Sequence, residues 1–130
     1  MQNRDATIIE LRGGSLGTLN PEVSMEEAFQ NNTLRPILKL QNNLLLQVFT
    51  HHVKQQKSTF FGLNSNKKEE YIEQMLLRDQ PLRNTIKGLI IGMFTLNEYQ
   101  EYAIHASVLN KRMMGLVTER LKSQMQLLEE

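Results

Sequence analysis

The chain has 130 residues, enough for one domain with its own core and too few for a multidomain protein. Its 15 lysines and arginines nearly balance its 14 aspartates and glutamates, so it lacks the basic excess typical of nucleic-acid-binding proteins. The absence of cysteine excludes disulfides, thiolate metal sites and cysteine nucleophiles. No apolar run approaches the roughly 20 residues of a membrane span, and the first residues lack the apolar stretch of a signal peptide. We therefore expect a cytoplasmic protein with no membrane partner.

Residues 1–23 differ in composition from the rest of the chain. Gly13, Gly14 and Gly17 lie there with Pro21, and glycine costs the most backbone entropy to order while adding no side chain to bury. We therefore predict a flexible N-terminal segment over residues 1–23, followed by a single helical domain over residues 24–130.

From residue 24 onward the start signals are those of helices. Residues 24–27 (SMEE) have the form of a capping box and predict a short helix to about residue 30. Asn32, Thr33 and Pro36 predict the start of a second, longer helix that reaches about residue 57, because proline is tolerated in a first turn. Apolar residues surround this helix on nearly all sides, which indicates a central position or a second partner.

After a break over residues 58–65, the pattern predicts helices over 66–77, 79–94, 95–102 and 107–128. Asp79 and Pro81 form a cap and first turn, and residues 95–98 (TLNE) form a second capping box. No stretch after residue 23 alternates with a period of two, so no strand is expected. The predicted fold is all-α, a compact bundle of five to six helices.

One candidate site consists of basic side chains that could bind an anion. Arginine suits a carboxylate or phosphate because its planar fork donates two parallel hydrogen bonds. The alternative for each side chain is an ion pair with a nearby carboxylate, such as Asp79 for Arg83. The residues of this candidate site are Arg78, Arg83, Lys87 and Arg120.

A second candidate is an apolar interaction surface. Three residues extend the apolar surface of the long helix away from its main face, and methionines of the last helix adapt to irregular partners. This surface would bind a protein partner or a second copy of the chain; the alternative is an ordinary core. Its residues are Leu46, Phe49, Val53, Met114 and Met125.

Gly88 and Gly92 form a small-xxx-small pattern. Glycines four residues apart on one face of a helix let another helix approach closely. We expect a tight helix crossing in the core; a homodimer contact and a gap that admits a flat ligand are the alternatives.

Signals for a metal, a cofactor or a catalytic group are missing from the sequence. His51, His52 and His105 lack the i, i+4 spacing of a helical zinc site, so we expect no metal. No glycine-rich phosphate loop and no G-x-S-x-G nucleophile motif is present, so we expect no cofactor and assign no catalytic residue.

Several segments resemble a family of small uncharacterised bacterial proteins. They are FQNNTLRPILK (29–39), RDQPLRN (78–84), GLIIGMFTLNEY (88–99), LNKRM (109–113) and ERLK (119–122). The resemblance covers most of the chain after residue 24. Some members are labelled glyoxalase, which implies a lyase-type enzyme as one alternative function. The glyoxalase I fold, however, consists of βαβββ units with His and Glu ligands on strands, and this sequence predicts no strands. No functional residue carries over from the family.

The leading interpretation is a non-catalytic helical module for protein interaction, with a homodimer as the expected form of self-association. The alternative is a protein, or a lyase-type enzyme, that binds a small anionic metabolite. RNA binding through basic residues of the last helix is disfavoured by the net charge of +1. The sequence identifies neither the partner nor the ligand.

Overall fold

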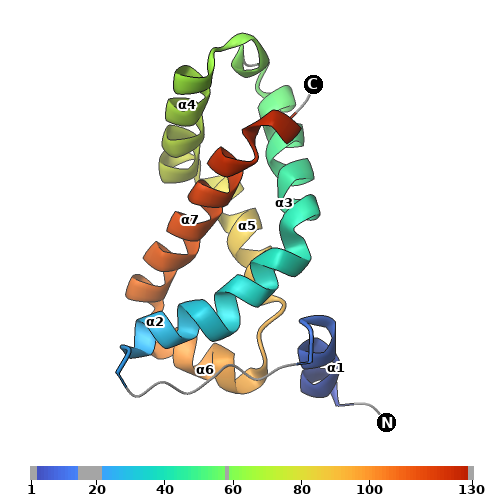
Figure 1. Ribbon diagram of the computed structural model, residues 1–130, viewed down its shortest axis with the longest axis vertical. Helices are drawn as coiled ribbons and strands as arrows, with labels where there is room; N and C mark the ends of the chain where they lie inside the picture. The colour runs from blue at the N-terminus through green and yellow to red at the C-terminus, as the bar shows by residue number, and fades with distance from the viewer. Residues whose placement is uncertain (1–2, 15–21, 58, 129–130) are drawn as a thin grey trace.

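A computed structural model of the chain describes residues 3–14, 22–57 and 59–128, and within these ranges it contains helices and no β-strand (Figure 1). The all-α prediction is thereby confirmed. No helix in the described ranges is both long enough and apolar enough to cross a membrane. The helices are α1 (Arg4–Leu11), α2 (Met25–Phe29), α3 (Arg35–Gln55), α4 (Ser65–Arg78), α5 (Gln80–Ile91), α6 (Leu96–Ile104) and α7 (Ala106–Ser123). A π-helical segment, Gln30–Leu34, joins α2 to α3, and short 3₁₀ turns occupy Phe60–Gly62 and Met125–Leu127.

The bundle is built around α3, α5 and α7. In Figure 1, α4 lies at the upper left and α3 at the right, α7 runs diagonally from the lower left to the upper part of α3, α5 lies between α7 and α3, and α6 lies at the lower end. The buried apolar side chains of α2 to α7 form one hydrophobic cluster that extends from Phe29 to Leu128. Its fully buried members include Ile37, Ile86 and Leu109.

Three predicted helix starts are confirmed by their caps. The Ser24 side chain accepts a hydrogen bond from the Glu27 N–H, and the Asp79 side chain accepts one from the Leu82 N–H. Thr95 and Glu98 form a complete capping box at the start of α6. Each cap satisfies amide groups that the first turn of a helix leaves unpaired, which is why such residues mark helix starts in a sequence.

The predicted start of a second helix near Asn32 is wrong, because α2, the π-helical segment and α3 form one continuous helix (Figure 1). Within it, the Arg35 N–H donates to the Gln30 carbonyl, five residues earlier. Pro36 has no N–H, so the Asn32 carbonyl, which residue 36 would bond in an α-helix, is left without that partner. The Asn32 carbonyl instead accepts a hydrogen bond from Arg12 at 3.2 Å.

The flexibility of residues 1–23 stays a prediction, but part of this segment is helical in the structure. Asn3 caps the helix α1, and the Arg4 side chain donates to the carbonyls of Gly92 and Phe94, both at 2.9 Å. The Leu96 N–H donates to the Asp5 carboxylate at 3.2 Å. Residues 4–11 are therefore helical, and the start of this helix is bonded to the loop between α5 and α6. Residues 1–2 and 15–21 of the predicted segment lie outside the described residues.

Gly88 and Gly92 do not mark a tight helix crossing. Gly88 is exposed on α5, and a Cβ atom added to it would meet no other atom within 4 Å. A Cβ atom on Gly92 would approach the Gly88 carbonyl oxygen at 3.1 Å. No neighbouring helix among the described residues requires a glycine at position 88.

Gly88→Ala should therefore raise the free energy of unfolding, by about 1 kcal/mol, because alanine loses less backbone entropy than glycine in a helix. Urea denaturation measures this change. Gly92→Ala is the matched control and should give a smaller gain or a loss, since its Cβ meets the carbonyl. A Gly88→Ala variant that is less stable than the native chain would indicate that another molecule covers this face, as a homodimer contact requires.

Candidate functional site

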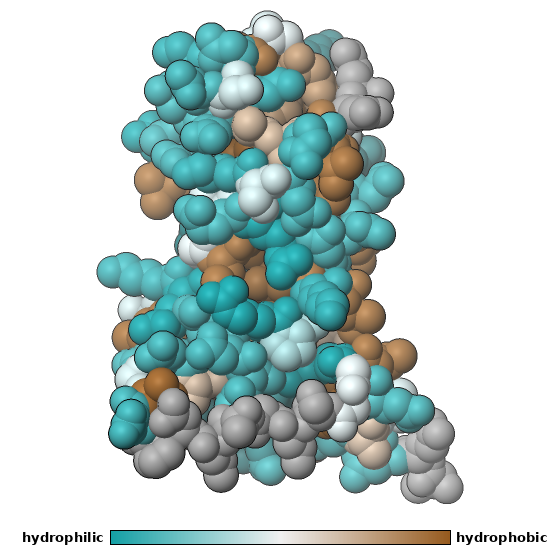
Figure 2. Space-filling model, viewed as in Figure 1, coloured by the Kyte–Doolittle hydropathy of each residue, from teal (hydrophilic) through white to brown (hydrophobic). Residues whose placement is uncertain are grey.

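A groove of about 400 Å³ lies between the first half of α3 and the last turns of α7. This volume is within the range of about 300–1,000 Å³ typical of small-ligand sites. Figure 2 shows hydrophobic surface in the middle of the molecule, between α3 and α7, framed by hydrophilic side chains. The residues that line the groove are Arg35, Leu38, Leu116, Glu119, Arg120, Ser123 and Gln124.

Arg120 is held at the groove by a pair of amide side chains. Asn42 and Gln124 bond each other through two hydrogen bonds of 2.8 Å, which run in opposite directions. The Asn42 Oδ1 atom that accepts from Gln124 also accepts from Arg120 Nη1, at 3.2 Å. Because α3 supplies Asn42 and the chain just after α7 supplies Gln124, the packing of the two helices fixes the arginine.

Arg35 lies on the opposite side of the groove, at the start of α3. Its Nε atom donates to Asn31 Oδ1 at 3.1 Å, within the π-helical segment. No ion pair within the described residues uses Arg35 or Arg120. Glu119, an acidic residue in the lining, is largely exposed and lies 3.9 Å from Lys122. Both arginines therefore retain an unpaired charge, and each has further N–H groups, beyond the one bonded to asparagine, that could bind a ligand.

The structure does not bring the four predicted anion-binding residues together. Arg83 donates to the Leu76 carbonyl at 2.6 Å and lines a different hollow, together with Lys111 and Thr118. Arg78 is exposed beside a third hollow, and Lys87 is half-buried on α5. A helix turns by about 100° per residue, so Thr118 and Arg120 face nearly opposite sides of α7. Of the four, Arg120 alone lines the groove between α3 and α7, together with Arg35.

The predicted pair of Asp79 with Arg83 is also wrong. Asp79 caps α5 and lies 2.7 Å from His52 Nε2 and 2.9 Å from Gln56 Nε2. Burial raises the pKa of Asp79, but hydrogen bonds from the Leu82 N–H, His52 and Gln56 outweigh it and leave the pKa below its ordinary value. Asp79 therefore joins α3, α4 and α5. Within the described ranges, no three His, Asp or Glu side chains converge as a metal site would need.

The predicted interaction surface belongs to the core. Leu46, Phe49, Val53 and Met114 are buried, and Met125 is partly buried against the same cluster. The Phe49 ring meets the Phe60 ring edge-on, with centroids 5.8 Å apart. At Phe49 the second partner of α3 is therefore the chain itself, through the segment between α3 and α4, whereas Leu40 and Leu44 of the same helix are exposed.

Comparison with known proteins finds no match to this chain among family models, curated proteins or solved structures. The geometry of the groove is what remains to suggest a function. Sequence reasoning found Arg120 through its position on the inward face of the last helix. The same reasoning missed Arg35. The signal that could have indicated Arg35 is the neighbouring Pro36, which interrupts the hydrogen bonds of the helix at that position.

Proposed function

We propose that this protein binds a small organic anion in the groove between α3 and α7. The observation that carries the proposal is the pair of arginines, Arg35 and Arg120, which flank an apolar floor and form no ion pair within the described residues. Leu38 and Leu116 provide that floor. The ligand class that fits is a carboxylate or phosphate monoester with a short apolar part.

The two arginines would contribute differently to binding. Arg120 is already oriented by Asn42, so fewer side-chain rotations are lost when an anion binds. Arg35 is exposed and has a hydrogen bond to Asn31, so it would close on the ligand from the rim. Each guanidinium can donate two parallel hydrogen bonds to one anionic group.

The proposal concerns binding and names no catalytic residue. The Ser123 hydroxyl in the groove donates a hydrogen bond to the Arg120 carbonyl at 2.9 Å. Its proton is therefore bonded to the helix backbone and not to a general base. Of the residues on which the predicted protein-interaction module depended, four are buried in the core and Met125 is partly buried, so the anion-binding alternative has the stronger support. It now uses Arg35 and Arg120 in place of the four residues first predicted.

Thermal shift against a panel of short carboxylates and phosphate monoesters, followed by calorimetric titration, tests the proposal. A ligand at 100 times its Kd should raise stability by about 2.7 kcal/mol. Arg120→Gln and Arg35→Gln should each weaken binding at least tenfold, since a charge-assisted hydrogen bond contributes about 1.5–3 kcal/mol.

Arg78→Gln is the matched control, because Arg78 is an exposed arginine outside the groove. It should bind the same ligand within twofold of the native chain. A panel without any shift, or ligands that bind Arg120→Gln and Arg35→Gln as tightly as the native chain, would refute the proposal.

A further inference from the structure

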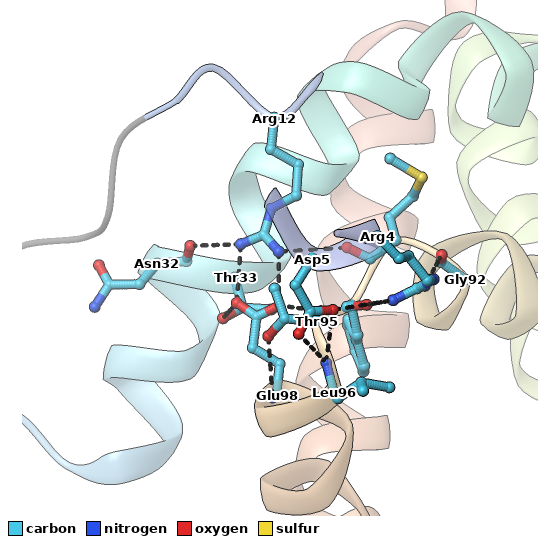
Figure 3. A network of polar contacts seen from close by, with 11 residues as sticks. Arg4, Asp5, Arg12, Asn32, Thr33, Gly92, Thr95, Leu96 and Glu98 are labelled. Carbon is cyan, nitrogen blue, oxygen red and sulfur yellow. Dashed lines mark hydrogen bonds and ion pairs between the residues drawn. The ribbon is translucent and has the colours of Figure 1, made fainter. Parts of the chain in front are cut away.

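Arg12 occupies a pocket in which both Nη atoms of its guanidinium group meet acceptors, while its buried Nε atom has no hydrogen-bond partner among the described residues (Figure 3). Its two Nη atoms donate to the two oxygens of Glu98, at 2.6 and 2.9 Å. The carbonyls of Asn32 and Met93 accept from the same group at 3.2 and 3.3 Å. The Arg12 side chain is only 5% exposed. Paired parallel bonds with added carbonyl acceptors give a geometry specific for a guanidinium.

The bundle builds this pocket without α1. The Thr95 N–H and the Thr33 hydroxyl each donate to Glu98 at 2.8 Å, and these bonds position its carboxylate. The Asn32 carbonyl can accept from Arg12 because Pro36 has no N–H group to bond it within the helix. Burial raises the pKa of Glu98, but the bonds from Arg12, Thr95 and Thr33 outweigh it and lower the pKa, so the carboxylate stays charged.

Helix α1 contributes little to the bundle beyond its polar contacts. Ile8 alone among its residues is buried, and Ile8 is not part of the hydrophobic cluster of α2 to α7. A helix of eight residues is marginal in water by itself, so α1 gains its helical structure by docking. Gly13 and Gly14 follow it, both with positive φ, and their N–H groups donate to the carbonyls of Glu10 and Ile9, which caps α1 and turns the chain away from the helix axis.

We propose that the Glu98 pocket is a binding site for an arginine carried on a helix, and that α1 is its displaceable occupant. Helix α1 leaves and returns as a unit, while α2 to α7 remain folded. When α1 has left, the Glu98 carboxylate and the carbonyls of Asn32 and Met93 can accept hydrogen bonds from an arginine of another chain. The residue pattern of the ligand is that of α1 itself, an arginine at the end of an amphipathic helical turn.

Hydrogen exchange of the native chain and of Arg12→Ala tests whether α1 moves separately. In the native chain, the amides of α1 should exchange at least 100-fold faster than those of Ile86 and Leu109 in the core. In Arg12→Ala, α1 should lose its protection while the core amides keep theirs. Exchange of α1 and the core at one common rate in the native chain would overturn the proposal, whatever the variant does.

A synthetic peptide of residues 3–14 tests the pocket directly. It should bind the full-length Arg12→Ala chain, as measured by fluorescence anisotropy. The same peptide with alanine in place of Arg12 should bind at least tenfold more weakly, as should the native peptide with a chain that also carries Thr33→Val. Absence of binding at millimolar peptide, or equal binding of the two peptides, would overturn the proposal.

Discussion

Val53→Asp should abolish the cooperative folding of the chain. Val53 has 0% of its surface exposed and belongs to the hydrophobic cluster of the bundle. A carboxylate placed there loses its hydration without gaining a partner, and it costs several kcal/mol of a total stability of about 5–15 kcal/mol. Circular dichroism at 222 nm and a thermal melt should show lost helicity and no sharp transition.

Gln47→Asp is the matched control, since Gln47 is exposed on the same helix. It should change the free energy of unfolding by less than about 1 kcal/mol. A Val53→Asp chain that keeps its helicity and its melting transition but sediments as a smaller species would contradict the buried position. That result would indicate that Val53 lies at a contact between two copies of the chain, as the sequence analysis predicted.

Phe60→Ala should lower the free energy of unfolding by about 3–5 kcal/mol. The Phe60 ring is fully buried and meets the rings of Phe49 and Tyr71, with centroids 5.8 and 5.1 Å away. It anchors the segment between α3 and α4 to both helices, so alanine leaves a cavity at their junction. Urea denaturation, with the slope checked for two-state behaviour, measures the loss.

Phe61→Ala provides the comparison within the same 3₁₀ turn. Phe61 is only partly buried against the core, so its loss should cost about half as much or less. Equal costs for the two substitutions would show that the segment is held by its backbone and not by the Phe60 ring.

The helix starts were predictable because their signals are local. The side chains of Ser24, Asp79 and Thr95 each accept a hydrogen bond from the N–H group three residues ahead, and such an interaction can be predicted from spacing alone. Pro36 was a local signal with two outcomes. It can begin a helix or, as here, lie inside a longer one whose hydrogen bonds adjust around the missing N–H.

The site was less predictable because its contacts join distant parts of the chain. Arg12 and Glu98 are 86 residues apart, and Arg120 and Asn42 are 78 residues apart. The sequence shows that α3 has apolar residues on nearly all sides, but not whether a second chain or the Phe60 segment covers Phe49. Only the packed structure distinguishes these cases.

The π-helical segment Gln30–Leu34 has a consequence for how homologous chains can vary in length. A π-turn encloses one residue more than an α-turn, so it equals a single inserted residue in an otherwise regular helix. Deletion of one residue there would restore a regular helix and leave the buried faces of α2 and α3 in register. Homologues with that deletion should lack Pro36, because in a regular α-helix its ring would clash with the carbonyl four residues earlier.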